Sequence, residues 1–269
     1  MALPPPAPDT TAVVTGASSG IGADLARQLA ARGHGVTLVA RREDRLRELA
    51  AELAGTVRVE VIAADVADSA ARAELFAEIE RRGLTVDILV NNAGIGTIGA
   101  VVDSTPEVEI AQVRVNVEAV IDLTTRAVQQ MVPRRRGAIL NVGSTAGFQP
   151  FPGQSGYAAT KAFVRSYTEG LRAEVAGTGV TVAALHPGPV RTEFLSVAGI
   201  DERTFADAFP KFMWLSPREV AKAGIDGLAE DRAEVIPGLP NQIGAKVFGL
   251  LPNRLLLPLL KKQHPALRG

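Results

Sequence analysis

The sequence predicts an α/β fold in which a doubly wound parallel β-sheet has helices on both faces, within a single domain. Short apolar runs alternate repeatedly with longer helical stretches, and a glycine-rich turn follows the first run. No linker or fixed-period repeat divides the 269 residues. Such alternation is typical of parallel sheets with right-handed crossovers, whose ligand crevice lies beyond the C-terminal strand ends. A functional site is therefore expected there.

The expected strands are short runs rich in β-branched and apolar residues, which favour extended structure. The first is TAVVT at residues 11–15. Similar runs predict strands at residues 36–40, 57–63, 86–90, 138–142 and 180–185, with a short strand near 234–236.

Helices are expected between these strands. The charged stretch RREDRLRELAAEL, at residues 41–53, follows the second strand directly. Longer stretches with helical patterns predict further helices at about residues 21–32, 69–82, 106–131, 155–175 and 217–228. Each helix would then connect two neighbouring parallel strands.

Three segments make up the chain in this interpretation. Residues 1–10, MALPPPAPDT, are predicted to be a disordered tail; they lack the basic start and apolar stretch of a secretory signal, so we expect a cytoplasmic protein. Residues 11–240 form the α/β domain, in which the functional site is expected. Residues 241–269 form an apolar C-terminal extension.

Composition excludes several classes of function. The chain has 29 basic and 29 acidic residues and no basic block, which argues against a nucleic-acid partner. It has no cysteine, so disulfides and thiolate metal sites are excluded. The three histidines, His34, His186 and His264, are widely separated, and no metal site is predicted.

A glycine turn follows the first strand in the segment TGASSGIG. Gly16, Gly20 and Gly22 permit a tight turn, close approach of a pyrophosphate and close helix–strand packing. The free N–H groups at the start of the following helix would bind the phosphates. This position in the first βα unit predicts a dinucleotide cofactor.

The second strand runs into Arg41 and Arg42, with no acidic residue at its tip. An acidic residue there would bind a ribose 2′-hydroxyl, whereas arginine favours a 2′-phosphate. We therefore expect NADP(H) to be favoured over NAD(H). The alternative is that both arginines only begin a solvated helix face.

A candidate acid–base pair lies on the helix that begins near residue 155. Tyr157 and Lys161 are spaced i and i+4, so they share one helix face. A nearby ammonium favours a phenolate and lowers the pKa of a tyrosine. Ser144, at the end of the fifth expected strand, has a hydroxyl that can orient or polarise a carbonyl oxygen.

These motifs together resemble the short-chain dehydrogenase/reductase family, in its compact single-domain branch with a Rossmann-like fold. The matching segments are TGASSGIG, the NNAG segment at residues 91–94, Asn116 in VNVEAV, and the PGPVRT segment at residues 187–192. Ser144, Tyr157 and Lys161 match the rest of the family's catalytic tetrad. The resemblance covers about residues 11–192, with no departure among the core positions.

The resemblance implies a role for each tetrad residue. Tyr157 would exchange the proton with the carbonyl or hydroxyl oxygen of the substrate. Lys161 would lower the pKa of Tyr157 and bind the nicotinamide ribose. Ser144 would hold the substrate oxygen, and Asn116 would support a water relay to Lys161. A homodimer or homotetramer is also implied.

The motifs and the resemblance together assign the contacts around the site. The expected cofactor contacts are Gly16, Ser18, Ser19, Gly20, Ile21, Gly22, Arg41, Arg42, Asp65, Val66, Asn92, Ala93, Gly94, Tyr157, Lys161, Pro187, Gly188, Val190 and Thr192. Within this set, Asp65 and Val66 would flank the adenine and Val190 the carboxamide. The expected substrate contacts are Ser144, Tyr157 and Phe194.

Aromatic residues concentrate between residues 194 and 214, where Phe194, Phe205, Phe209, Phe212 and Trp214 lie. Loops over the crevice should set specificity, so this segment predicts an apolar lid and a hydrophobic carbonyl or alcohol substrate. The alternative is that these rings pack the segment against its own domain or form a subunit contact.

The segment NQIGAKVFGLLPNRLLLPLL at residues 241–260 is also apolar. Its basic residues and prolines interrupt it, so no transmembrane helix is expected. A cap over the substrate pocket or an oligomer contact is the favoured interpretation, and a helix lying on a membrane surface is the alternative.

The sequence thus predicts an NADP(H)-dependent oxidoreductase that interconverts a carbonyl and an alcohol. The alternative is a non-catalytic, nicotinamide-binding regulatory or scaffold protein with the same fold. The joint presence of Asn116, Ser144, Tyr157 and Lys161 favours catalysis, because such a scaffold has no need of all four.

Overall fold

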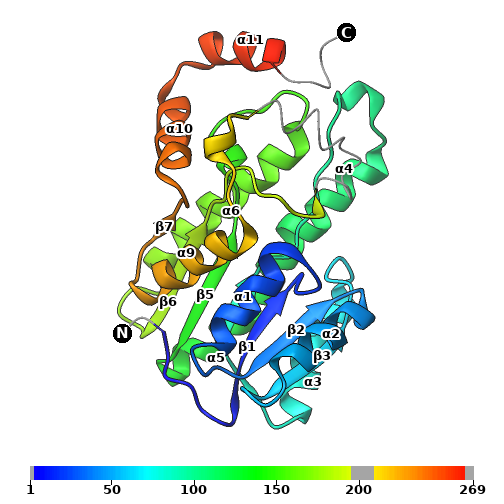
Figure 1. Cartoon of the computed structure of the whole chain (residues 1–269), viewed down its shortest axis with the longest axis vertical. Helices are drawn as coiled ribbons and strands as arrows, with labels where there is room; N and C mark the ends of the chain where they lie inside the picture. The colour runs from blue at the N-terminus through cyan, green and yellow to red at the C-terminus, as the bar shows by residue number, and fades with distance from the viewer. Residues whose placement is uncertain (1–2, 195–208, 264–269) are drawn as a thin grey trace.

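The computed structural model describes residues 3–194 and 209–263, and its centre is a seven-stranded, all-parallel sheet (Figure 1). The strand order is β3-β2-β1-β4-β5-β6-β7. The strands are β1 (Thr10–Thr15), β2 (Val36–Ala40), β3 (Val59–Ala63), β4 (Thr85–Asn91), β5 (Gly137–Val142), β6 (Val180–Leu185) and β7 (Glu234–Val235). The order reverses between β1 and β4, which confirms the doubly wound α/β sheet.

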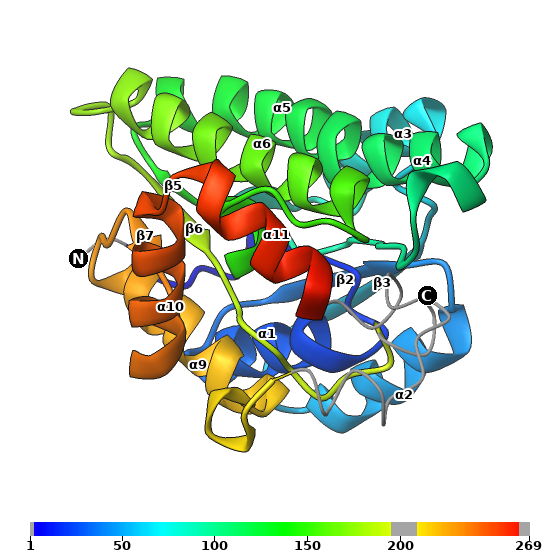
Figure 2. The same cartoon turned by 90° about the horizontal axis from the view of Figure 1, so that it is seen from above.

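Helices cover both faces of this sheet (Figure 2). One face carries α1 (Gly20–Ala30), α2 (Glu43–Leu53) and α9 (Pro217–Ala229), and the other carries α3 (Ser69–Arg81), α5 (Ala119–Arg134) and α6 (Ser155–Glu174). Each face has its own buried apolar cluster, because the central strands are apolar on both sides. This double layer fixes the strand ends from which the site is built.

The helix expected at residues 106–131 is divided into three parts. It consists of α4 (Pro106–Val113), a π-helical turn (Arg114–Glu118) and α5. The π-turn contains Asn116, which is almost fully buried. Single π-turns within α-helices frequently mark functional sites.

The N-terminal segment differs from the disordered tail that its composition predicts. Leu3 packs against the apolar cluster of α1 and α2, and Pro4 is buried. The carbonyl of Asp9 accepts a hydrogen bond from the backbone N–H of Thr85, at 2.9 Å. Residues 3–9 are therefore part of the folded domain, because a proline-rich segment loses little further conformational freedom when it packs.

The C-terminal extension forms α10 (Leu239–Leu250) and α11 (Asn253–Gln263). Asn241 is buried and fastens α10, because its amide donates to the carbonyls of Met213 at 3.0 Å and Pro237 at 3.1 Å. Figures 1 and 2 show α11 lying over the edge of the sheet at which the strands end. Within residues 3–194 and 209–263, every helix is too short or too polar to cross a bilayer.

Candidate active site

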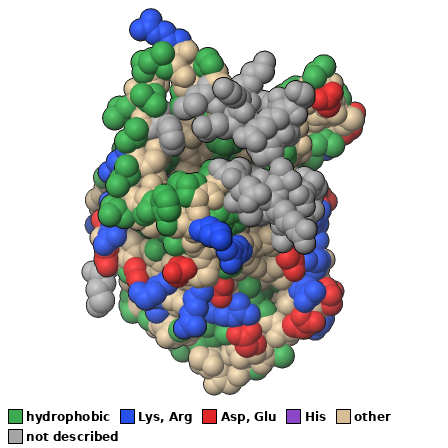
Figure 3. Space-filling model, turned by 45° about the horizontal axis from the view of Figure 1, so that its top comes forward, with side chains coloured by type: hydrophobic (Ala, Val, Ile, Leu, Met, Phe, Trp, Pro, Cys, Tyr) green, Lys and Arg blue, Asp and Glu red, His purple; other side chains and the backbone are tan. Residues whose placement is uncertain are grey.

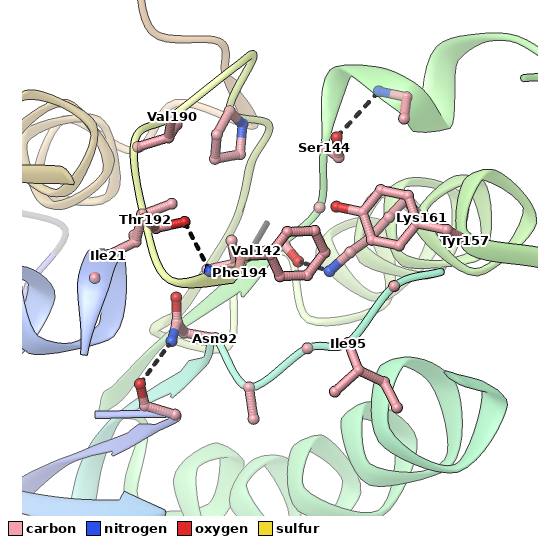
Figure 4. Close-up of a pocket in the computed structure, with 18 of the residues that line it drawn as sticks. Ile21, Asn92, Ile95, Val142, Ser144, Tyr157, Lys161, Val190, Thr192 and Phe194 are labelled. Atoms are coloured by element: carbon pink, nitrogen blue, oxygen red, sulfur yellow. Dashed lines mark hydrogen bonds between the residues drawn. The ribbon is translucent and has the colours of Figure 1, made fainter. Parts of the chain in front are cut away.

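One cavity of about 830 Å³ lies at the C-terminal ends of the sheet strands. Every residue that the sequence assigned to the site lines this cavity except Asn116 (Figure 4). We call the part formed by the β1–α1 turn and the tips of β2, β3 and β4 the cofactor side. We call the part formed by Phe194, Phe209, Met213, Ala245 and Leu260 the substrate side.

The glycine turn on the cofactor side leaves no room for side chains. Gly16 and Gly20 have φ values of +67° and +55°, which side-chain-bearing residues rarely adopt. A Cβ at Gly22 would lie 2.2 Å from the Gly16 carbonyl oxygen and 2.4 Å from the amide nitrogen of Asn92. The turn therefore requires glycine at these positions, and it lines the cavity.

The NNAG segment holds this turn in place. The backbone N–H groups of Asn92 and Ala93 both donate to the Thr15 hydroxyl at 3.0 Å. The Asn92 amide donates to the Thr15 carbonyl at 2.9 Å. Asn92 therefore joins the ends of β1 and β4 and fixes the shape of the cofactor side.

Arg42 lies directly over the glycine turn. Its guanidinium donates to the hydroxyls of Ser18 at 3.0 Å and Ser19 at 2.8 Å, and to the Glu193 carboxylate at 2.8 Å. Arg41 is more exposed, and its guanidinium lies 4.0 Å from the Asp65 carboxylate. Arg42 and the two serines form a cluster of donors at the tip of β2.

Tyr157 and Lys161 lie on one face of α6, and Ser144 faces the Tyr157 hydroxyl from the end of β5 (Figure 4). The Lys161 ammonium is buried and donates to the Val142 carbonyl at 2.9 Å. The Ser144 hydroxyl accepts from the Ala146 N–H at 3.1 Å, which caps the short helix that follows. The end of β5 and the first turns of α6 thus bring the three side chains together.

Burial dominates the ionisation of this group. It raises the pKa of Tyr157 to about 12, and a hydrogen bond with Ser144 opposes that change. It also lowers the pKa of Lys161 to about 8. The Lys161 ammonium lies 5.8 Å from the centre of the Tyr157 ring. Burial of the phenolate thus outweighs the Ser144 hydrogen bond, and the lowering of the Tyr157 pKa by the Lys161 ammonium stays a prediction.

Asn116 lies behind the cavity wall. Its amide donates to the Ile95 carbonyl at 2.8 Å and to the Thr160 hydroxyl at 3.0 Å, and its side-chain carbonyl accepts from the Ile95 N–H at 3.0 Å. It therefore ties the π-turn to the loop after β4 and to α6. A Cβ on neighbouring Gly94 would lie 3.4 Å from the Lys161 ammonium nitrogen, so glycine keeps that approach open.

The PGPVRT segment contacts both sides of the cavity. Thr192 lies against Gly20, where an added Cβ would be 3.1 Å from the threonine methyl. The Pro187 carbonyl accepts from the Thr145 N–H at 2.9 Å, which connects this segment to the Ser144 loop. A Cβ on Gly188 would lie 2.5 Å from the Asn241 side-chain oxygen, so α10 packs closely against the segment.

The expected aromatic lid is realised in part. Phe194 and Phe209 line the cavity, and the Phe194 ring lies 5.6 Å from the Tyr157 ring. Phe212 is 70% exposed and does not line the cavity, whereas Trp214 is half-buried and donates to the Phe209 carbonyl at 3.3 Å. Phe205 lies outside the described residues.

Several lining residues had not been assigned from the sequence. They come from the loop after β5, from the segment before α9 and from the C-terminal helices, and they are Gln149, Phe151, Gln154, Met213, Gly244, Ala245 and Leu260. Gly96 also belongs here, because an added Cβ would lie within 2.9 Å of both the Phe194 and Tyr157 rings. The glycine two residues after NNAG was a signal that could have found it.

Comparisons with known proteins agree with this geometry. The family model described as short chain dehydrogenase matches residues 10–202. Sulfoacetaldehyde reductase 2 of Chromohalobacter salexigens is 34% identical over 250 residues, which cover 90% of this chain and 94% of that protein.

Solved structures give the same result. A short-chain dehydrogenase from Sphingobium yanoikuyae in complex with NADPH is 35% identical, with a TM-score of 0.79, over 93% of this chain and 94% of that one. A 7β-hydroxysteroid dehydrogenase is 27% identical, with a TM-score of 0.82, over 93% and 96% of the two chains.

Proposed function

Since the chain belongs to the short-chain dehydrogenase family, we propose that it is an NADP(H)-dependent oxidoreductase that interconverts a carbonyl and an alcohol, with Tyr157 as acid–base group. The observation that supports this most strongly is the convergence of Ser144, Tyr157 and Lys161 on one cavity that also contains the glycine turn. Fold alone would not license the step from architecture to activity.

The cofactor side fits a phosphorylated nicotinamide dinucleotide. The turn at Gly16 and Gly22 would be filled by any Cβ, so backbone N–H groups can approach a pyrophosphate. The Arg42 guanidinium and the Ser18 and Ser19 hydroxyls offer a cationic, donor-rich position for a 2′-phosphate. The related Sphingobium enzyme was solved with NADPH. When bound, the cofactor supplies or accepts the hydride.

The protein's contribution is to hold the substrate oxygen and to move one proton. With a pKa of about 12, Tyr157 is protonated at neutral pH and can donate to a carbonyl oxygen as reduction proceeds. The Ser144 hydroxyl, which faces it, orients the same oxygen. The buried Lys161 ammonium stabilises the tyrosinate that forms, and its neighbour Gly94 leaves space for a ribose.

The substrate side supports a hydrophobic carbonyl compound. Phe194, Phe209, Met213 and Leu260 line the cavity, and the Phe194 ring lies 5.6 Å from the Tyr157 ring. A hydroxysteroid dehydrogenase shares the fold over most of the chain. Such a wall favours apolar substrates by removing their surface from water.

One residue favours a second class of substrate. Arg114 lines the cavity, and it forms no ion pair with any residue in the described part of the chain. A free guanidinium could bind an acidic group, and the relative from Chromohalobacter is named for an acidic aldehyde. Carbonyl compounds that carry a carboxylate or sulfonate are therefore the second candidate.

A substrate screen tests this function. NADPH consumption would be followed with neutral apolar ketones and aldehydes and with acidic carbonyl compounds, using Tyr157→Phe as the blank. We expect turnover by the wild type and a loss of at least about 100-fold in the variant, because the ring stays and only the proton donor is removed. Near-native turnover by Tyr157→Phe, with unchanged NADPH binding, would refute the mechanism.

The same screen separates the two substrate classes. Arg114→Ala should leave reduction of neutral ketones unchanged and should raise the KM of any acidic substrate by roughly tenfold or more, the effect of losing a charge-assisted hydrogen bond. Activity confined to small, polar sugars would contradict both classes.

A further inference from the structure

Helix α10 is amphipathic, but its large apolar side chains lie on the side that faces away from the cavity. The side of α10 that faces the cavity has Asn241, Gly244 and Ala245, which are polar or small. The outer side has the larger apolar residues Leu239, Ile243, Val247 and Leu250, at helical spacing. A helix that only capped the pocket would bury its large apolar residues instead.

This outer face continues into α11. Leu250 is 85% exposed, Leu255 is 63% exposed, and Leu251 lies between them. Figure 3 shows hydrophobic side chains gathered along the edge formed by these helices, with Lys or Arg side chains at its upper end. We call the set Leu239, Ile243, Val247, Leu250, Leu251 and Leu255 the C-terminal apolar face. Contiguous exposed apolar surface of this kind marks an interaction site.

The charged residues of the C-terminal segment that contains this face have one sign. Five basic residues and no acidic residue follow Glu234. Because the whole chain has 29 residues of each kind, the first 234 residues have an excess of five acidic groups. Lys246 and Arg254 are exposed beside the apolar face and form no ion pair with any residue that the structure describes. The electrostatic partner of this face should therefore be anionic.

We propose that the C-terminal apolar face is a docking surface for an anionic lipid bilayer. Exposed leucines flanked by lysine and arginine are the composition of helices that lie in a membrane interface. A second copy of this chain fits less well, because a two-fold contact would place the same positive segment against itself, with no acidic residue in it to compensate. The positive charge of this segment therefore favours the bilayer over a two-fold contact.

Docking would bring the cavity close to the bilayer. Leu260 lines the cavity and Leu255 belongs to the C-terminal apolar face, so α11 contributes to both. This consequence, that an apolar substrate enters from the lipid, rests on the proposed function. The docking surface itself does not, because vesicle binding is measured without turnover.

Flotation of the full chain with lipid vesicles tests the proposal. We expect it to float with vesicles of phosphatidylcholine and phosphatidylglycerol, to float poorly with phosphatidylcholine alone, and to dissociate as salt is raised. The double variants Leu250→Ser/Leu255→Ser and Lys246→Glu/Arg254→Glu should each reduce partitioning by roughly tenfold or more. Retained NADPH binding would show that both are folded.

The matched control is Val101→Ser/Val102→Ser, which removes exposed apolar side chains from a short 3-10 helix distant in sequence from α10 and α11. It should leave partitioning unchanged; an equal loss would show general adhesion and overturn the proposal. Absence of flotation by the wild type would overturn it as well. Light scattering gives a third test. If the molecular mass of Leu250→Ser/Leu255→Ser were lower than that of the wild type while flotation stayed the same, the face would join two copies of the chain, and the proposal would be overturned.

Discussion

The cofactor side and the substrate side of the cavity are built in different ways. The cofactor side consists of backbone and polar groups held by hydrogen bonds, such as those from Asn92 to Thr15 and from Arg42 to Ser18 and Ser19. The substrate side consists of apolar side chains such as Met213 and Leu260, which come from late segments of the chain. Hydrogen bonds fix direction, whereas apolar contacts are non-directional.

This difference predicts how each side responds to substitution. On the cofactor side a single added carbon atom should greatly reduce cofactor binding, because the backbone cannot move away from it. On the substrate side the same kind of change should shift preference among substrates without loss of the cofactor. Substitutions on both sides of the cavity test this contrast, and the largest expected effect comes first.

Gly22→Ala should have the largest effect. The added Cβ would lie 2.2 Å from the Gly16 carbonyl oxygen, so the turn must open. Overpacking of this kind costs about 1–3 kcal/mol of stability, and we expect NADPH affinity to fall at least about 100-fold as the phosphate-binding turn distorts. Fluorescence titration with NADPH and thermal unfolding would measure both.

Gly170→Ala is the matched control for Gly22→Ala. Gly170 lies within α6 with open space around its Cα, so alanine should raise helix stability by up to about 1 kcal/mol. Cofactor affinity should not change. Equal NADPH affinity of the Gly22→Ala variant and the wild type would show that the turn is not the cofactor site.

Arg42→Ala should come next. It removes the guanidinium that lies on Ser18 and Ser19, and a hydrogen bond to a charged group is worth about 1.5–3 kcal/mol. We expect kcat/KM for NADPH to fall roughly 10- to 100-fold while that for NADH changes little. Arg41→Ala should have a smaller effect, because its guanidinium lies further out, beside Asp65. A variant that loses NADH and NADPH equally would contradict a 2′-phosphate role.

The cofactor side was largely predictable from the sequence. Gly16, Gly20, Gly22 and Arg42 belong to short motifs whose geometry depends on neighbours in the chain, and all of them line the cavity. The strands were also predicted to within about two residues, because the apolar run of each buried strand is visible in its local sequence.

Other features depend on contacts distant in sequence and could not be read in advance. Asn116 in the π-turn bonds to Ile95 and Thr160, which are far away along the chain. The pKa of Tyr157 depends on desolvation in the folded cavity wall, which no local pattern reveals. Met213 and Leu260 are ordinary apolar residues, and only the folded chain shows that they line the cavity.

The pH dependence tests the boundary between the two sides, where Lys161 lies. Its pKa of about 8 means that the ammonium is lost as pH rises through 8. The value of kcat/KM for NADPH, which reports groups of the free enzyme, should therefore decline above about pH 8. Unfolding is not the cause: the unfolded state, with a lysine pKa of 10.5, binds more protons between pH 8 and 10.5, so this residue's contribution to stability rises with pH there.

Lys161→Met serves as the control for this pH profile. Methionine has no ammonium, so the variant should be slower at all pH values and should lack the decline near pH 8. A decline of the same position in both proteins would assign it to another group.

Met213→Ala should have the smallest effect and bears directly on the contrast. Met213 lines the substrate side, and its truncation removes apolar contact worth about 0.8 kcal/mol for each buried methylene. We expect KM for a bulky apolar ketone to rise about 3- to 10-fold, with no change in the KM for NADPH. Phe212→Ala is the control, since Phe212 is the adjacent residue, is largely exposed and does not line the cavity. If both variants changed KM equally, or if Met213→Ala weakened NADPH binding, the two sides of the cavity would not be separable, and substrate preference would have to be sought in the catalytic residues themselves.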